Sequence, residues 1–297
     1  MNPEILLNEQ ELALDVLQRR LAPSLRRHRD ALIQIYGTEM SRGVLKPKPI
    51  GSGVLVHLSG EHFLLSAGHV LKHFVNQPPI TYVGHNNSEP VVLDGDVKVE
   101  PELPGFENKY RNGLDVGVIK LRSAAVGELR SANFLSIVDL AQAPISDSQP
   151  KYVSTGFPET KTDVIVHLKR LKVRSLSTIC KLASFEDAMG LGFSNDTHII
   201  YRYDKKLRYQ RGNNNTESPD PEGMSGGGFF YLPNIFRILE KEVEWKLIGI
   251  IIQSHRTELP YRLNVVVRIA CFIDFIVHHF SHLADARRGR QPVAYFN

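Results

Sequence analysis

The chain has 297 residues, of which 42% are hydrophobic and 23% are charged, a balance that is ordinary for a folded globular protein and excludes extensive disorder. Its two cysteines, Cys180 and Cys271, exclude the dense disulfide framework of small secreted proteins. We therefore predict a reducing compartment and a cytoplasmic protein. The N-terminus carries early acidic residues and no long apolar run, so we expect no signal peptide. We expect no membrane contact, because no apolar stretch has the length of a membrane span.

The first predicted unit, residues 1–46, is a helical extension. Asn2 caps a helix that starts at Pro3, and Pro23 opens a second helix that ends at Gly37. The apolar residues of the second helix recur at helical spacing, as Leu25, Leu32, Ile33 and Tyr36. Arginines are frequent in the same segment, which indicates either a docking face for a regulatory protein partner or a solvated helix face.

The second predicted unit, residues 47–297, has the pattern of an all-β domain. Short apolar runs recur between clusters of Gly, Pro, Asn and Asp, which is typical of a β-barrel or a β-sandwich. The strand candidates include residues 53–58, 62–66, 116–121, 152–156, 197–203, 227–232, 245–253 and 263–268. Strand signals fade over residues 123–148, and residues 267–283 favour a closing helix ahead of a basic tail.

A histidine follows the first predicted hairpin. His69 stands in a turn of small residues, Ser66, Ala67 and Gly68, directly after a buried strand. An imidazole that is held in this way is suited to proton transfer near neutral pH. The alternative is a structural histidine at the end of a strand, with its hydrogen bonds satisfied and no catalytic role.

A carboxylate opens the next strongly apolar strand. Asp115 directly precedes residues 116–121, and a buried aspartate is costly unless it is paired. The alternative is a turn-forming aspartate beside Asn112 and Gly113.

A serine among glycines precedes an aromatic strand. Residues 221–228 read PEGMSGGG, with Ser225 at the centre. Glycines permit backbone conformations that are closed to other residues, and they leave room for a substrate carbonyl beside the backbone N–H groups. Such clusters also form ordinary turns, so this motif is ambiguous on its own.

The same turn matches the Gly-x-Ser-x-Gly elbow of the α/β-hydrolases. That elbow requires a strand before the serine, a helix after it, and the acid and histidine later in the chain. Here a polar loop over residues 211–221 precedes Ser225, a strand follows it, and His69 and Asp115 come earlier. We therefore exclude this class. No glycine-rich phosphate loop links a strand to a helix either.

Together, the motifs of His69, Asp115 and Ser225 resemble the chymotrypsin/trypsin-like serine peptidase family in residue type, context and chain order, with a somewhat long gap before the serine. The chain is most similar to the bacterial, Deg-like type without an appended peptide-binding domain. The resemblance implies two antiparallel β-barrels with the active site between them. Its parts would be a first barrel over 47–122, a connector over 123–148, a second barrel over 149–266, and a C-terminal helix and tail over 267–297.

The resemblance also implies a serine endopeptidase and the roles of its residues. Ser225 would be the nucleophile, His69 the general base and Asp115 the carboxylate that orients it. The backbone N–H groups of Gly223 and Ser225 would form the oxyanion hole. An extended polypeptide substrate would add as a strand beside Ile252, Gln253 and Ser254. Pro219 and Asp220 would lie at the base of the specificity pocket, where Asp220 either favours a basic side chain or is a solvated loop acid.

Met224 separates this chain from the animal trypsins, which carry an aspartate there that pairs with a newly cleaved N-terminus. Residues 50–54 look like an intact strand, so we expect no activation by N-terminal processing. We expect regulation by a partner, or by ordering of the N-terminal helices or of residues 212–221. The alternative function is a binding or signalling module that keeps the fold without chemistry.

We expect no metal ion and no cofactor. His278 and His282 share a face of the last helix, but no cysteine or carboxylate stands at ligand spacing. A formal net charge of +4 admits nucleic-acid binding, yet the chain has no nucleic-acid motif and no aromatic stacking platform. We therefore do not expect nucleic acid as a partner.

Overall fold

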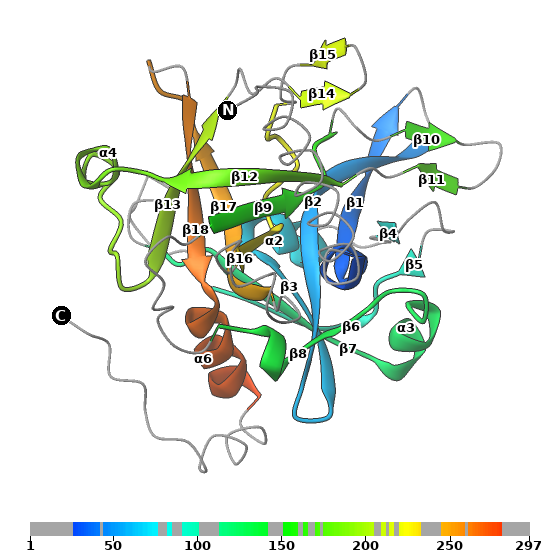
Figure 1. The fold of residues 1–297 in the computed structure, drawn as a ribbon. Helices are drawn as coiled ribbons and strands as arrows, with labels where there is room; N and C mark the ends of the chain where they lie inside the picture. Colours follow the sequence, from blue (N-terminus) through cyan, green and yellow to red (C-terminus); the bar gives the residue numbers. More distant parts are fainter. Residues whose placement is uncertain are drawn as a thin grey trace, which may run out of the picture.

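β-strands dominate the fold, which divides into one larger sheet and one closed barrel (Figure 1). The computed structural model describes residues 26–41, 44–76, 82–84, 91–100, 113–141, 151–159, 163–165, 170–172, 175–204, 209–211, 214–216, 220–232, 245–258 and 261–280. The predicted all-β class is confirmed at this level.

The N-terminal half of the chain forms an eight-stranded sheet. In spatial order its main path runs through β5 (Val91–Val92), β4 (Tyr82–Gly84), β1 (Leu32–Ser41), β2 (Val44–Leu58), β3 (Glu61–Ala67), β7 (Val116–Leu121) and β6 (Gly95–Val99). Neighbours on this path are antiparallel, whereas β8 (Leu135–Ser136) pairs with β2 in parallel. The sheet therefore brings the start of β7 beside the end of β3.

The C-terminal half forms a closed six-stranded antiparallel barrel. Its strands, in spatial order, are β12 (Leu176–Leu182), β13 (His198–Asp204), β18 (Tyr261–Arg268), β17 (Lys246–His255), β16 (Gly228–Leu232) and β9 (Lys151–Gly156). Pairing of β9 with β12 closes the ring.

Short elements complete the described fold. Besides the helical residues 26–30, the helices are α2 (Gly68–Asn76), α3 (Ser123–Glu128), the 3₁₀ turn η1 (Ile137–Asp139), α4 (Phe185–Met189) and α6 (Ile269–His279). Two small hairpins pair β10 (Asp163–Ile165) with β11 (Arg170–Lys172), and β14 (Tyr209–Arg211) with β15 (Asn214–Thr216). The predicted closing helix is confirmed as α6, which contacts β7, β17 and β18. Of the described helices, none combines the length and the apolar character that crossing a bilayer needs.

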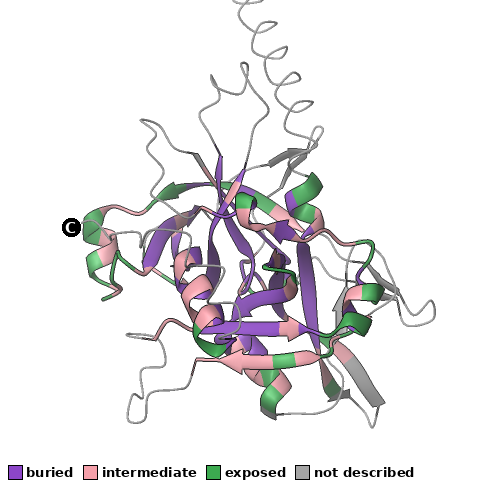
Figure 2. Cartoon of the chain, turned by 90° about the horizontal axis from the view of Figure 1, so that it is seen from below, coloured by how far each residue is buried: buried purple, intermediate pink, exposed green. Residues whose placement is uncertain are grey.

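The sheet and the barrel share the larger of two hydrophobic clusters, and the second cluster belongs to the barrel. Phe63 and Leu65 of β3 belong to the same buried cluster as Ile250 of β17 and Val265 of β18. Figure 2 shows buried strands in the interior of the molecule, with partly exposed and exposed helices and loops around them. Because both units bury apolar surface against each other, their relative position is fixed by packing as well as by the chain.

The predicted helix from Pro23 to Gly37 is wrong over most of its length. Residues 26–30 are helical, but Leu32 opens β1, and β2 already starts at Val44. The first sheet therefore begins well before residue 47. All side chains from Leu32 to Tyr36, including Gln34, are fully buried, which suits a strand covered on both faces. In so short an apolar run, periodicity alone does not separate a buried strand from a helix.

The predicted strands of the previous subsection match observed ones within a few residues, except that β2 begins nine residues before the predicted start at residue 53. Strand β12 and several short strands, among them β8, β10, β11, β14 and β15, were not predicted. The predicted connector contains α3, β8 and η1 before residue 142. The helix expected from Pro3, and with it most of the proposed docking face, lies outside the described residues.

Candidate active site

Asp115 holds His69 by two hydrogen bonds. The backbone N–H of His69 donates to Oδ1 of Asp115 at 2.8 Å, and Nδ1 of the imidazole lies 2.7 Å from Oδ2. The Asp115 side chain is 13% exposed, whereas that of His69 is 37% exposed. A buried carboxylate thus orients an imidazole that solvent can reach, which leaves Nε2 available as a base when Nδ1 carries the proton.

The backbone places the two residues where the first sheet turns into α2. His69 is the second residue of α2, and Asp115 directly precedes β7, which pairs with β3. Asp115 has a φ of 49°, a left-handed conformation that aspartate tolerates better than most residues. Its carbonyl accepts a hydrogen bond from the N–H of Gly68 at 2.6 Å. Both the backbone and the side chain of Asp115 therefore hold the start of α2.

A second carboxylate, Glu100, lies behind Asp115. The N–H of Glu100 donates to the carbonyl of Val116 at 2.9 Å, and its buried Oε2 has no hydrogen-bond partner among the described residues. Burial raises the pKa of Glu100, and the negative charge of Asp115 raises it further. Asp115 thus has a second carboxyl group nearby, which the sequence motif did not indicate.

The serine turn contains two backbone N–H groups that have no acceptor among the described residues. Gly223 and Gly226 have φ values of 88° and 87°, which only glycine adopts readily. The N–H groups of the other turn residues have acceptors: Met224 donates to Pro221, Gly226 to Ile251 and Gly227 to Met224. Within the described part of the chain, the N–H groups of Gly223 and Ser225 have none. These are the two groups predicted to form an oxyanion hole.

The Ser225 hydroxyl does not donate to His69 in this conformation. It donates instead to the carbonyl of Ile252 at 3.3 Å, and the Ser225 residue is partly exposed. The distance is long for a hydroxyl donor, so little holds the hydroxyl in this orientation. The structure therefore brings His69 and Asp115 into direct contact but leaves the third member oriented elsewhere.

Ser52 of β2 ties the serine turn to the first sheet. Its N–H donates to the carbonyl of Ser225 at 2.7 Å, and its hydroxyl donates to the carbonyl of Gly223 at 2.8 Å. Its own carbonyl accepts the hydroxyl of Ser66 at 2.7 Å, and Ser52 is fully buried. The turn from the second half of the chain is thus anchored on the strand next to the one that leads to His69.

Gly51 explains how closely these parts approach. A Cβ on Gly51 would lie 2.7 Å and 2.8 Å from the methyl groups of Val70, and 2.9 Å from the carbonyl oxygen of Ser225. Val70 follows His69 in α2. Only a residue without a side chain lets the histidine helix and the serine turn share this space.

The predicted substrate edge lies on β17. On the side of β17 that faces β16, the last pair is Ile250 with Gly228. On the side that faces β18, pairing continues after a register shift, and Gln253 lies opposite Val265. No described strand therefore pairs with residues 252–254 on the β16 side. Gln253 Oε1 and Ser254 Oγ are buried and have no hydrogen-bond partner among the described residues.

The two predicted pocket residues have different outcomes. Pro219 lies outside the described residues. Asp220 binds the guanidinium group of Arg262, whose side chain is only 10% exposed. Met224 is buried in the barrel core beside Tyr201 and Phe229, where its side chain has a packing role.

The sequence interpretation missed Ser52 and Glu100 as parts of the site. A signal for Ser52 is present, because the run Gly51, Ser52 and Gly53 repeats the serine-among-glycines pattern of the serine turn around Ser225. No local pattern marks Glu100.

In the described ranges no three His, Cys, Asp or Glu side chains gather as metal ligands, while His282 lies outside them. Comparison with known proteins gives no relative: no protein-family model and no curated protein matches the chain.

Proposed function

We propose that this protein is a serine endopeptidase of the double-barrel, trypsin-like type, with the curled first sheet as its first barrel. The observation that carries the proposal is the pair of unused N–H groups at Gly223 and Ser225, in a turn that Ser52 fastens to the sheet bearing His69 and Asp115. Two N–H donors in one turn, neither with an acceptor among the described residues, are the groups that an oxyanion hole requires.

The proposed reaction starts when the Ser225 hydroxyl rotates from the Ile252 carbonyl toward His69. Its oxygen attacks the carbonyl carbon of the substrate, and its proton moves to Nε2 of His69. The carbonyl oxygen becomes an oxyanion on the N–H groups of Gly223 and Ser225. His69 then gives the proton to the departing amine, which leaves an ester on Ser225. Water, deprotonated by His69, attacks the carbonyl carbon of this ester; the bond to the Ser225 oxygen breaks, His69 returns the proton to that oxygen, and the acid is freed.

The proposed substrate is a polypeptide in extended conformation. Residues 252–254 offer backbone groups without a strand partner on the β16 side, which favours binding by strand addition. The carboxylate of Asp220 is already bound by Arg262, so it supplies little net charge to attract a basic side chain. Both cysteines are free and buried, which is compatible with the reducing cytoplasm that we propose as the compartment.

Labelling with a fluorophosphonate probe tests the proposal. We expect labelling of the full chain, its complete loss in Ser225→Ala and strong slowing in His69→Ala. The matched control is Ser131→Ala, an exposed serine outside the site. Absence of labelling in the folded chain, also with candidate protein partners present, would overturn the proposal.

The hydrogen bond from Ser225 to Ile252 favours a second candidate, a module that keeps the fold without catalysis. Mass spectrometry after labelling separates the two, because a silent module carries no adduct on Ser225. A regulated enzyme gives a third pattern, in which labelling rises when a partner is added or when residues 1–25, which precede the sheet, are deleted. Full labelling of the isolated chain, unchanged by that deletion, would contradict regulation through this segment.

A further inference from the structure

Glu100 stands at the point where the first sheet meets the proposed site. It directly follows β6, whose last pair with β7 is Val99 opposite Gly117. One residue further on, the N–H of Glu100 still donates to the carbonyl of Val116 at 2.9 Å. The ladder between the two strands thus fixes the backbone of Glu100 beside the residue that follows Asp115.

The carboxyl group of Glu100 lies against the turn that leads into β7. A Cβ on Gly113 would lie 3.9 Å from Oε2 of Glu100. Burial raises the pKa of Glu100, and the backbone N–H groups of Leu114, Asp115 and Val116 oppose this shift as hydrogen-bond donors. The buried Oε2 has no hydrogen bond of its own among the described residues, so the three N–H groups act on the carboxyl group together, as oriented dipoles.

Glu100 has no counter-charge in the described part of the chain, since no cation is among the groups that shift its pKa. The other titratable group that faces it is the Cys271 thiol in α6. Burial and then the charge of Asp274 raise the pKa of this thiol, and the charge of Glu100 adds to the effect. A buried carboxylate without a cation is costly, so the N–H groups of the turn are what stabilises it.

Asp115 needs support from its surroundings because its backbone is strained. Its φ of 49° is left-handed, and such a conformation at a residue other than glycine persists only where neighbouring groups hold it. Successive N–H groups in a turn of this kind form a concave site for an anion. From this conformation Asp115 accepts both the N–H and the imidazole of His69. An anion in the concave site therefore also holds the carboxylate that orients the imidazole.

We propose that Glu100 is a positioning residue of the site, whose carboxylate holds the turn at Asp115 in the left-handed conformation from which Asp115 orients His69. This role rests on the proposed peptidase function, in which His69 is the general base. Glu100 touches neither the substrate nor the reacting atoms and acts only through Asp115.

Glu100→Gln tests this role, because it keeps the size of the side chain and removes its charge. The first readout is the proton on Nδ1 of His69, whose NMR signal lies far downfield when a carboxylate accepts that proton. We expect this signal in the wild type and its loss in Glu100→Gln. Labelling of Ser225 by the fluorophosphonate probe should slow by roughly tenfold to a hundredfold, as the loss of a hydrogen-bonded charge requires. Glu128→Gln, an exposed glutamate of α3, leaves both readouts unchanged.

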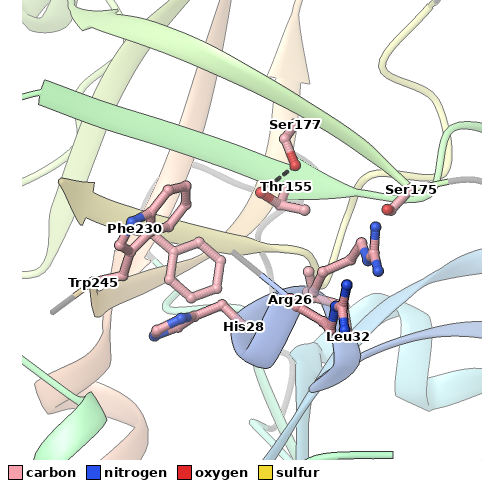
Figure 3. Close-up of a pocket in the computed structure, with 9 residues that line it drawn as sticks. Arg26, His28, Leu32, Thr155, Ser175, Ser177, Phe230 and Trp245 are labelled. Carbon is pink, nitrogen blue, oxygen red and sulfur yellow. Dashed lines mark hydrogen bonds between the residues drawn. The ribbon is translucent and has the colours of Figure 1, made fainter. Parts of the chain in front are cut away.

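Trp245 shows whether these variants are folded. It is the only tryptophan in the sequence and is 4% exposed. It packs against His28 and Phe230 at one wall of a pocket of about 460 Å³ (Figure 3). None of the residues that line this pocket belongs to the proposed site. An emission spectrum like that of the wild type therefore shows that the barrel is packed, whatever happens at His69.

Titration of Glu100 itself keeps the role testable if Glu100→Gln does not fold. Besides burial, the negative charge of Asp115 raises the pKa of Glu100. In Asp115→Asn we therefore expect the carboxyl carbon of Glu100, followed by NMR, to titrate at lower pH than in the wild type. Asp96→Asn, an exposed aspartate on β6, leaves this titration unchanged.

Three results overturn the proposal. One is a downfield signal and a labelling rate in folded Glu100→Gln that equal those of the wild type. Another is the absence of the downfield signal from the wild type, and the third is an unchanged titration of Glu100 in folded Asp115→Asn. The NMR readouts need no reaction at Ser225, so failure here and failure of the peptidase proposal are distinguishable.

Discussion

The hydroxyl of Ser52 donates a hydrogen bond to the carbonyl of Gly223 across 171 residues of chain. The same oxygen accepts the N–H of Phe157 at 2.9 Å, and the N–H of Ser52 donates to the carbonyl of Ser225. The Ser225 N–H belongs to the peptide group between Met224 and Ser225. The contacts from Ser52 hold the peptide group before it, through the Gly223 carbonyl, and the one after it, through the Ser225 carbonyl. Ser52 therefore determines where the proposed oxyanion donors point.

Replacing Ser52 by alanine removes the anchor on Gly223 and leaves two buried backbone groups without their partner. An unsatisfied buried group costs about 1–3 kcal/mol, so we expect fluorophosphonate labelling of Ser225 to slow by roughly tenfold to a hundredfold. Labelling rates measured beside Ser131→Ala, with thermal melting to check the fold, decide the point. A folded Ser52→Ala chain that labels at the wild-type rate would contradict this role.

Gly226 and Gly60 form a matched pair for testing the serine turn. Both have positive φ, 87° and 86°, but a Cβ on Gly226 would lie 1.8 Å from the carbonyl oxygen of Ser52, whereas Gly60 has nothing within 4 Å. Gly60→Ala should cost about 1–2 kcal/mol from its conformation alone. We expect a clearly larger loss of unfolding free energy in Gly226→Ala, together with loss of labelling. Equal losses in denaturant titration would show that the turn is not confined by Ser52.

Asp115→Asn tests the orientation of His69. Asp115 accepts both the backbone N–H and the imidazole of His69, and an asparagine turns one of these acceptors into a donor. We expect the fold to persist and labelling of Ser225 to fall by roughly 10³ to 10⁴, as for other triads. Asp96→Asn, an exposed aspartate on β6, serves as the control. A fall of less than tenfold would argue against a triad.

His198 should make the protein sensitive to acid. Burial beside Phe193 lowers the pKa of His198 to about 4, below its ordinary value of 6.5. Between these two values the unfolded chain binds more protons than the folded one, so stability falls as the pH decreases from 6.5 toward 4. The full effect is about 3 kcal/mol. Unfolding free energies of wild type and His198→Gln at pH 7, 5 and 4 measure it. Parallel pH curves for the two proteins would refute this assignment.

The parts of the site that the sequence predicts are those with local motifs. His69, Asp115 and Ser225 each stand in a short run of characteristic residues, and the order of the runs relates them. Ser52 acts through hydrogen bonds to Gly223 and Ser225, more than a hundred residues away, and no local pattern contains such partners.

Two of the errors in the fold, at β12 and at β1, have separate physical causes. Strand β12 has its alternation inverted, with Thr178 and Cys180 buried and Ile179 67% exposed, so the hydrophobic pattern does not indicate a strand. Strand β1 is buried on both faces, so its apolar residues show no two-residue period and also fit a helix. In both cases the surrounding sheet determines the conformation, and local propensity does not.

Because the serine turn is anchored on Ser52, the site can form only after both of these segments have been synthesised. Synthesis delivers β2 early, but the turn that contains Ser225 follows more than half the chain later, and Ile252 later still. N-terminal parts of a chain fold first as they emerge from the ribosome. A nascent chain therefore carries the histidine and aspartate without the serine turn, and the complete site forms only after the strand that contains Ile252 has been synthesised.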